Sequence, residues 1–233
     1  MIKIENIDVY GFEAAIRGAR NPMNSWDRMD SCYNNGEFEI GENDYKLLKN
    51  LTIAGPEHRK WNRMVTVTMD ITAPLYWWKE YDTYKVGTVA NSCSTMHKIQ
   101  AKKFEMSDFS TEHLDDGTLE IMRLVIAELN CDRILFNSGK DKKYWWQMIQ
   151  LLPTSYNQKR TAHLNYEVLG TIYHQRRHHK LDEWVVFCDT IKTLPYNEFI
   201  TREFEIGGDI MYDILKTLTK PQMSMLMIMK LYY

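Results

Sequence analysis

The 233-residue sequence has little cysteine, and what it has is scattered. The four cysteines are far apart and include no Cys-x-x-Cys pair; they are Cys32, Cys93, Cys131 and Cys188. Zinc sites and disulfide frameworks need cysteines at close or regular spacing. We therefore expect no metal site and four free thiols, of which Cys32, Cys131 and Cys188 fill packing positions.

The sequence also lacks a long hydrophobic run and an excess of charge of either sign. No apolar stretch approaches the roughly 20 residues that a membrane-spanning helix needs. The first residues, MIKIENIDVYGF, alternate charged with apolar side chains, which is not the pattern of a signal peptide. A net charge of −2 argues against a surface that coats nucleic acid or an anionic membrane. We expect a cytoplasmic protein that binds neither a membrane nor a nucleic-acid polymer, with any anion site formed by a local cluster of cations.

Strand and helix patterns cover the chain, with no repeat, low-complexity tract or linker. Val65, Val67, Met69 and Ile71 alternate with polar residues, which predicts a half-buried strand over 63–74. A further strand is predicted at 2–9, a loop or hairpin at 26–43 and a loop at 87–94. Helices are predicted over residues 11–21, 45–54, 75–85, 110–136, 142–153, 161–179, 181–194 and 207–220.

These patterns indicate a single α+β domain over residues 1–233, with a small antiparallel sheet and several helices. Asn43 and Asp44 are expected to cap the helix over 45–54, which Gly55 closes. The Met-rich apolar tail over residues 221–233 is too short to span a bilayer. We expect it to pack on its own domain or on a partner subunit.

Three segments carry a similarity to a known family between about residues 10 and 200. They are AAIRGAR (14–20), then LLKNLTIAGPEHRKW (47–61) with VTVTMDITAPLYWWKEYDTYKVGTVANSCS (65–94), and then LLPTSYNQKRTAHLNYEVLGTIYHQRRHHKLDEW (151–184). Their order and spacing resemble the flavin-dependent thymidylate synthase family. The resemblance implies an α+β fold that assembles as a homotetramer. It also implies an enzyme that uses FAD, with NADPH and folate, to alkylate C5 of a pyrimidine deoxynucleotide such as dUMP.

The family's signature is R-H-R, seven residues, and then Ser. In this sequence Thr83, Tyr84 and Lys85 stand in place of R-H-R, and Cys93 stands in place of Ser, so only Lys85 keeps a positive charge of the triplet. The same correspondence implies that the cofactor is contacted by His58, Tyr84, Lys85, Asn165 and Arg177. It implies that the nucleotide is contacted by Lys79, Glu80, Asn91, Ser92, Ser94, Lys159 and Arg160.

Cys93 is a candidate catalytic residue because it lies between two serines in a predicted loop. A thiolate beside Lys79 and Lys85 would have a lowered pKa and would attack a pyrimidine without a hydride from flavin. The other interpretation is a small buried residue that replaces Ser. The lysines and arginines allow a similar choice, because they either bind phosphate or face water on helix surfaces.

The sequence leaves three functions open. The first is an enzyme like the flavin-dependent thymidylate synthases. The second is a nucleotide-binding relative without flavin, which either does different pyrimidine chemistry through Cys93 or is a sensor or decoy without catalysis. The third is a structural protein that keeps only the fold. The changed triplet favours the second function, and the number of polar residues at the carried-over positions argues against the third.

Overall fold

The computed structural model of the chain describes residues 2–204. Residues 1–202 form one compact unit, to which all the helices and strands named below belong. The predicted helix over 207–220 and the tail over 221–233 lie outside the described residues. The prediction of one domain over the whole chain therefore stays a prediction.

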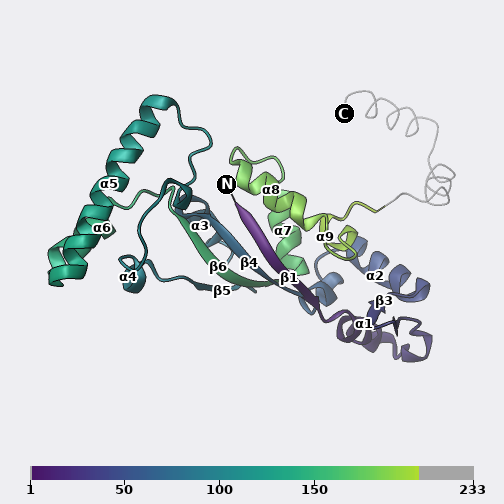
Figure 1. Cartoon of the computed structure of the whole chain (residues 1–233). Coiled ribbons are helices and arrows are strands. Elements are labelled where there is room, and N and C mark those ends of the chain that lie inside the picture. The colour runs from purple at the N-terminus through teal and green to yellow at the C-terminus, as the bar shows by residue number, and fades with distance from the viewer. Residues whose placement is uncertain (1, 205–233) are drawn as a thin grey trace, which may run out of the picture. The chain divides into compact units, whose positions relative to one another are not determined.

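A four-stranded antiparallel sheet forms the centre of the described unit (Figure 1). Its strand order is β1-β4-β6-β5, so strands far apart in the sequence are neighbours in the sheet. This arrangement confirms the predicted α+β class and the small antiparallel sheet. The strands are β1 (Lys3–Tyr10), β4 (Thr66–Pro74), β6 (Asn157–Asn165) and β5 (Val89–Ser92); a separate hairpin pairs β2 (Cys32–Asn34) with β3 (Glu37–Glu39).

The two faces of the sheet differ because side chains alternate along each strand. Along β4, Val67, Met69 and Ile71 are buried and contribute to the core, as the sequence predicted. Asp70 in the same strand and Lys159 in β6 belong to the opposite, polar face. The helices that follow β4 and β6 in the chain are α3 (Leu75–Tyr81), α7 (Tyr166–Arg176) and α8 (Asp182–Ile191).

Aromatic side chains from α3 and α8 fill the core. The ring of Trp77 lies 4.7 Å from that of Trp184 and 5.2 Å from that of Tyr81, measured between centroids. Trp78 and Phe187 belong to the same cluster, and all five side chains are at most 2% exposed. Aromatic pairs of this kind add about 0.5–1.5 kcal/mol each beyond the area they bury. The aromatic residues of the segments 77–81 and 184–187 therefore act first as a core.

A buried ion pair organises the residues between β1 and β4. Arg20 Nε donates to Asp44 Oδ1 at 2.6 Å, and Ser31 Oγ donates to Asp44 Oδ2 at 2.6 Å. The prediction that Asn43 and Asp44 cap the helix was wrong, because that helix begins at Glu42 and Asp44 is fully buried within its first turn. The elements here are α1 (Phe12–Arg20), η1 (Asn21–Met23), η2 (Trp26–Arg28), α2 (Glu42–Ala54) and η3 (Arg59–Arg63).

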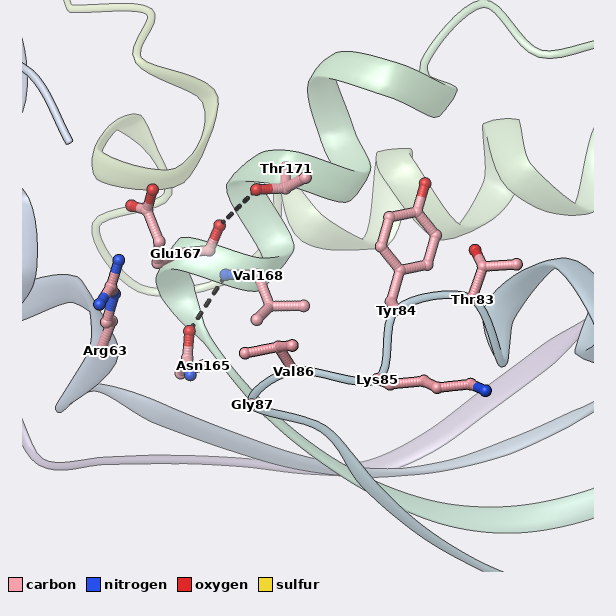
Figure 2. Close-up of a pocket in the computed structure, with 10 residues that line it drawn as sticks. All are labelled: Arg63, Thr83, Tyr84, Lys85, Val86, Gly87, Asn165, Glu167, Val168 and Thr171. Carbon is pink, nitrogen blue, oxygen red and sulfur yellow. Dashed lines mark hydrogen bonds between the residues drawn. The ribbon is translucent and has the colours of Figure 1, made fainter.

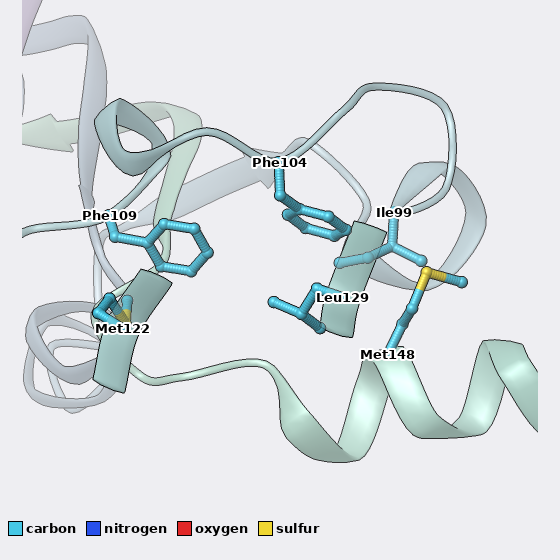
Figure 3. Close-up of a cluster of buried hydrophobic side chains, with 6 residues drawn as sticks. All are labelled: Ile99, Phe104, Phe109, Met122, Leu129 and Met148. Carbon is cyan, nitrogen blue, oxygen red and sulfur yellow. The ribbon is translucent and has the colours of Figure 1, made fainter. Parts of the chain in front are cut away.

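A long helical hairpin follows β5. Its first helix, α5, runs over Asp116–Gly139 and its second, α6, over Lys142–Leu151. Figure 3 shows the buried cluster that joins these helices to the segment before them. The cluster comprises Ile99, Phe104, Phe109, Met122, Leu129 and Met148. The remaining short helices are α4 (Thr95–Lys98), η4 (Met106–Asp108) and α9 (Glu198–Thr201).

Two predicted elements were wrong. The expected helix over 161–179 is a strand up to Asn165 and a helix only from Tyr166, because Ala162 and Leu164 are buried while Thr161 and His163 are exposed. This period of two places the segment between β4 and β5, where both edges of the strand are paired. The expected loop over 87–94 contains β5, since it pairs with β6.

The cysteine prediction was correct for one of the three expected packing residues. Cys188 is buried, and burial raises the pKa of its thiol to about 12. Cys32 and Cys131 are exposed, because Cys32 lies in the β2–β3 hairpin and Cys131 on the outer side of α5.

Candidate functional site

A cavity of about 490 Å³ lies between the loop that follows α3 and the first turns of α7 (Figure 2). Two of the carried-over cofactor positions, Tyr84 and Lys85, enter it from the loop, and a third, Asn165, enters it from the end of β6. The lining residues are Arg63, Thr83, Tyr84, Lys85, Val86, Gly87, Asn165, Glu167, Val168 and Thr171. The structure therefore brings together three residues that the sequence places up to 81 positions apart.

The start of α7 is closed by its own cap. Asn165 Oδ1 accepts a hydrogen bond from the Val168 N–H at 3.0 Å, which satisfies one of the free N–H groups of the first turn. Gly87 has a φ of +78°, and a Cβ at this position would lie 2.8 Å from Asn165 Nδ2 and 3.2 Å from Val168 Cγ2. Only glycine therefore lets the loop approach the helix start this closely.

Tyr84 is a fixed wall of this cavity. Its hydroxyl donates to Gln175 Oε1 at 2.9 Å and accepts from Arg176 Nε at 2.9 Å. Its ring meets the edge of Trp184 with centroids 6.1 Å apart. The residue in place of the family's central His is thus held by α7 and α8.

Glu80 lies in the same network. Its Oε2 accepts from Arg176 Nη1 at 2.8 Å and from Trp184 Nε1 at 2.9 Å, and His179 Nε2 lies 3.4 Å away. The resemblance implies that Glu80 contacts the nucleotide, where its carboxylate could accept a hydrogen bond from the base. In the structure this carboxylate already anchors α3 to α7 and α8, and its role in base recognition stays a prediction.

Lys159 and Arg160 point to opposite faces of the sheet, because they are adjacent residues of β6. Lys159 Nζ lies 3.0 Å from Asp70 Oδ2 on the polar face. Hydrogen bonds from Thr161 and Asn6, followed by Lys159, lower the pKa of Asp70 to about 2. Arg160 Nη1 donates to Asp82 Oδ1 at 2.8 Å instead.

Cys93 is exposed, so it is not the small buried residue of the second interpretation. Its backbone N–H donates to the Lys159 carbonyl at 2.9 Å, which continues the β5–β6 ladder. Lys159 is a cation that interacts electrostatically with Cys93. The predicted placement of Lys79 and Lys85 beside the thiol stays a prediction. Strand alternation places the thiol on the polar face with Asn91, away from Ser92 and Arg160.

Other predicted site residues lie outside the cavity. His58 is exposed just before η3, and Lys79 is exposed on α3. Arg177 follows α7, with its guanidinium 5.5 Å from the centre of the Tyr173 ring. Ser94 caps α4 by accepting from the His97 N–H at 3.0 Å. The roles predicted for these four residues stay predictions.

No protein-family model matches the sequence, and no curated protein matches it. Solved structures do match the fold. A crystal structure of thymidylate synthase X from Helicobacter pylori with FAD and dUMP superposes with a TM-score of 0.61 at 15% identity, over 85% of this chain and 96% of that one. The UMP/dUMP methylase PolB from Streptomyces cacaoi, bound with 5-Br dUMP, gives a TM-score of 0.58 at 15% identity, over 87% of this chain and 95% of that one.

This chain has the fold of the flavin-dependent thymidylate synthases. The resemblance read from the three sequence segments is thereby confirmed for the fold. At 15% identity the likeness shows the fold and carries no activity or ligand over to this chain.

Two charged residues of the cavity in this thymidylate synthase fold were missed by the sequence reasoning, namely Arg63 and Glu167. Glu167 accepts from Arg59 Nε at 2.9 Å and lies 3.8 Å from Arg202 Nη2. No spacing in the sequence links Arg63 with Glu167. Only the sheet register does so, because Thr66 pairs with Asn165 and makes the residues before β4 neighbours of those after β6.

The described part of the chain holds no group of three or more His, Cys, Asp and Glu residues arranged to bind a metal ion. Among residues 2–204, no helix has both the length and the apolar character needed to cross a membrane.

Proposed function

We propose that the protein binds a pyrimidine deoxynucleotide of the dUMP type in the cavity between the loop over 83–87 and α7, as the first step of alkylating C5 of the base. One observation carries the proposal. Tyr84, Lys85 and Asn165 line one cavity, on a fold with a solved example that holds FAD and dUMP. The resemblance gives these three positions to the cofactor, but the lining has too little positive charge for the diphosphate of FAD, so we assign the cavity to the nucleotide instead. Its volume of about 490 Å³ falls within the range of about 300–1,000 Å³ that is usual for small-molecule sites.

The lining supports a small planar ligand with polar edges. Figure 2 shows the side chains of Val86 and Val168, which both line the cavity, pointing toward one another, with the Tyr84 ring to one side. These apolar surfaces would cover the faces of a pyrimidine ring. Asn165 Oδ1 is occupied by the helix cap, so its Nδ2 group is the donor for a base carbonyl.

The lining of the first cavity has too little positive charge for a diphosphate. Arg63 and Lys85 carry two positive charges and Glu167 carries one negative charge, so the net charge is +1. The start of α7 is not open to a diphosphate, because the Asn165 side chain caps it and the Glu167 carboxylate lies in its first turn. These residues do not fit the diphosphate of FAD, so we assign no step of the reaction to flavin.

Isothermal titration of the full chain with dUMP tests the proposal, with dAMP as a purine comparator. We expect dUMP to bind and dAMP to bind more weakly. Gly87→Ala should weaken dUMP binding by about tenfold or more, because a misplaced methyl group in a packed site costs about 1–3 kcal/mol.

Gly36→Ala is the matched control for this variant. Gly36 also has a positive φ, +88°, but a Cβ there meets no atom within 4 Å. Both variants therefore strain the backbone, and only Gly87→Ala pushes on Asn165 and Val168. Equal losses of dUMP affinity in the two variants, or no dUMP binding by the unaltered protein, would contradict the proposal.

An absorbance spectrum after incubation with excess FAD and desalting tests the cofactor. We expect no flavin band to remain with the protein. A retained band would show that Thr83, Tyr84 and Lys85 hold the flavin in spite of their changed charge. NADPH oxidation with and without dUMP would then be the next assay.

A further inference from the structure

A second cavity of about 300 Å³ lies on the other side of the loop over 83–87, between the end of α3 and strands β5 and β6. Tyr84 and Lys85 line both cavities, so the two spaces adjoin at these residues. The second cavity is also lined by Tyr81, Asp82 and Arg160. A ligand that fills the first cavity is therefore adjacent to a second space with its own charged groups.

Arg160 is rigidly held at this cavity. Its guanidinium lies 4.2 Å from the centre of the Trp78 ring, and its Nε donates to Gln158 Oε1 at 3.0 Å. Its Nη1 donates to Asp82 Oδ1 at 2.8 Å. These two bonds use two of the five N–H groups of the fork. A guanidinium fixed in this way loses little side-chain entropy when it binds an anion.

Lys85 adds a second cation. It is exposed, and within residues 2–204 its ammonium group makes no ion pair. In Figure 2 its side chain extends away from Val86 and Val168, beneath Thr83. Asp82 is the opposing charge, but its side chain is 51% exposed and lies at the end of α3. Two cations and one carboxylate leave a net charge of +1.

Tyr81 supplies an independent sign that a polar group belongs here. The residue is only 2% exposed, and within the described part of the chain its hydroxyl has no hydrogen-bond partner. Burial, followed by Asp82, raises the pKa of this hydroxyl, while Arg160 lowers it. The group therefore stays a neutral donor next to Arg160. Buried polar groups without partners are rare, and each calls for an explanation such as a ligand or a water molecule.

We infer that this second cavity holds the phosphate of the nucleotide, bound by Arg160 and Lys85, while the base occupies the first cavity. The inference rests on the proposed function and goes further by assigning the two cavities to two parts of the ligand. The structure also shows which of the lysines and arginines named in the sequence analysis line this cavity. Lys159 pairs with Asp70 on the polar face of the sheet, and Arg176 pairs with Glu80, so neither lines this space.

The test compares dUMP with deoxyuridine, which has the same base and sugar but no phosphate, by titration calorimetry. Lys85→Gln should weaken dUMP binding by about tenfold, because a charge-assisted hydrogen bond contributes about 1.5–3 kcal/mol. Deoxyuridine binding should weaken much less, because Lys85 lines the first cavity as well but deoxyuridine has no phosphate to bind its charge. Arg160→Gln should have a larger effect on dUMP, and circular dichroism checks that this variant still folds.

Asp82→Asn provides an opposite test that does not remove a binding group. Loss of the carboxylate should strengthen dUMP binding by about threefold, since a like charge near the phosphate is removed, and should leave deoxyuridine binding unchanged. The matched control is Lys142→Gln, which removes an exposed lysine on α6, outside both cavities.

The outcomes separate the inference from the proposed function. If dUMP binds but Lys85→Gln and Asp82→Asn leave its affinity unchanged, or change dUMP and deoxyuridine equally, the phosphate lies elsewhere and the inference is wrong. The proposed function would then stand. If the unaltered protein binds neither ligand, both are wrong.

Discussion

The sheet with its helices and the α5–α6 hairpin use apolar side chains in different ways. Around the sheet, Trp77, Trp78 and Trp184 are 0–1% exposed. On α5, Ile121 and Leu124 are 62% and 66% exposed, although the same helix buries Met122 and Leu129 on its other side. Around the sheet, the helices and the strands bury each other's apolar side chains. In contrast, α5 has an apolar face that nothing in the described part of the chain covers. Such a face suits self-association, and the predicted homotetramer stays a prediction that this face makes testable.

The largest expected effect comes from emptying the aromatic core. Trp77→Ala should lower the free energy of unfolding by about 3–5 kcal/mol, because it removes a fully buried ring and leaves a cavity. Leu124→Ala on α5 should change it by less than about 0.5 kcal/mol. Urea unfolding followed by far-ultraviolet circular dichroism measures both. Similar losses in the two variants would mean that the face of α5 is as buried in solution as the core.

The contribution of ion pairs to stability should also differ between the buried part of the molecule and the exposed surface of α5. Asp44→Asn leaves the Arg20 guanidinium buried without a charged partner and should cost about 3–5 kcal/mol. The Glu120–Arg123 pair on α5 is 2.7 Å long but exposed, so Glu120→Gln should cost less than about 1 kcal/mol. The same urea experiment measures both, and a small loss for Asp44→Asn would show that Arg20 finds another partner.

Two aspartates should give opposite pH dependences of stability. Asp132 on α5 is 2% exposed, and burial, followed by Glu128, raises its pKa. Its protonated form is therefore favoured in the folded state, and this contribution to stability is lost as the pH rises through the raised pKa. Asp132→Asn should stabilise the protein near neutral pH by up to about 1 kcal/mol and remove this part of the pH dependence.

Asp70 on the sheet has a lowered pKa of about 2, mainly through Thr161 and Asn6. It contributes stability above the unfolded-state pKa, and the contribution is lost as the pH falls toward 2. Asp70→Asn should therefore flatten the loss of stability in acid. Unfolding curves of the two variants between pH 2 and pH 7 check both directions, and a shared direction would contradict the contrast.

The smallest effect on stability should come from a charge on the apolar face of α5. Leu124→Glu should leave the unfolding free energy of a single chain nearly unchanged, because the side chain is exposed. It should lower the mass measured by light scattering if that face joins copies of the chain. Lys143→Glu, also exposed and near the tip of the hairpin, is the control. An unchanged mass in Leu124→Glu would place any self-association on another surface.

Much of the fold was predictable from local patterns. The alternation of apolar and polar residues over 65–71 predicted β4, and Pro74 predicted the start of α3. The β6 strand was missed because its nine residues run directly into α7. The alternation of polar and apolar residues at the end of β6 was therefore interpreted as the start of a helix. What makes residues 157–165 a strand is pairing on both sides, and local sequence does not contain that information.

The site was predictable only in part, for a similar reason. Tyr84, Lys85 and Asn165 were found through the resemblance, and the structure places them around one cavity. Arg63 and Glu167 had no signal, because the register of β4 with β6 makes them neighbours. Cys93 and Lys159 were expected at the same site as Arg160. Strand alternation sends them to the opposite face of the sheet.

By itself, the sequence determined the class of fold, the buried face of β4 and the loss of one Arg and the His from the triplet at 83–85. These follow from local periodicity and residue identity, which need no knowledge of neighbours. The tertiary structure alone decided which cations share a space. Lys159 is paired with Asp70 and Arg176 with Glu80, while Arg160 and Lys85 line one cavity. The physical reason is that charge partners are set by strand register and alternation, which act between residues far apart in the chain.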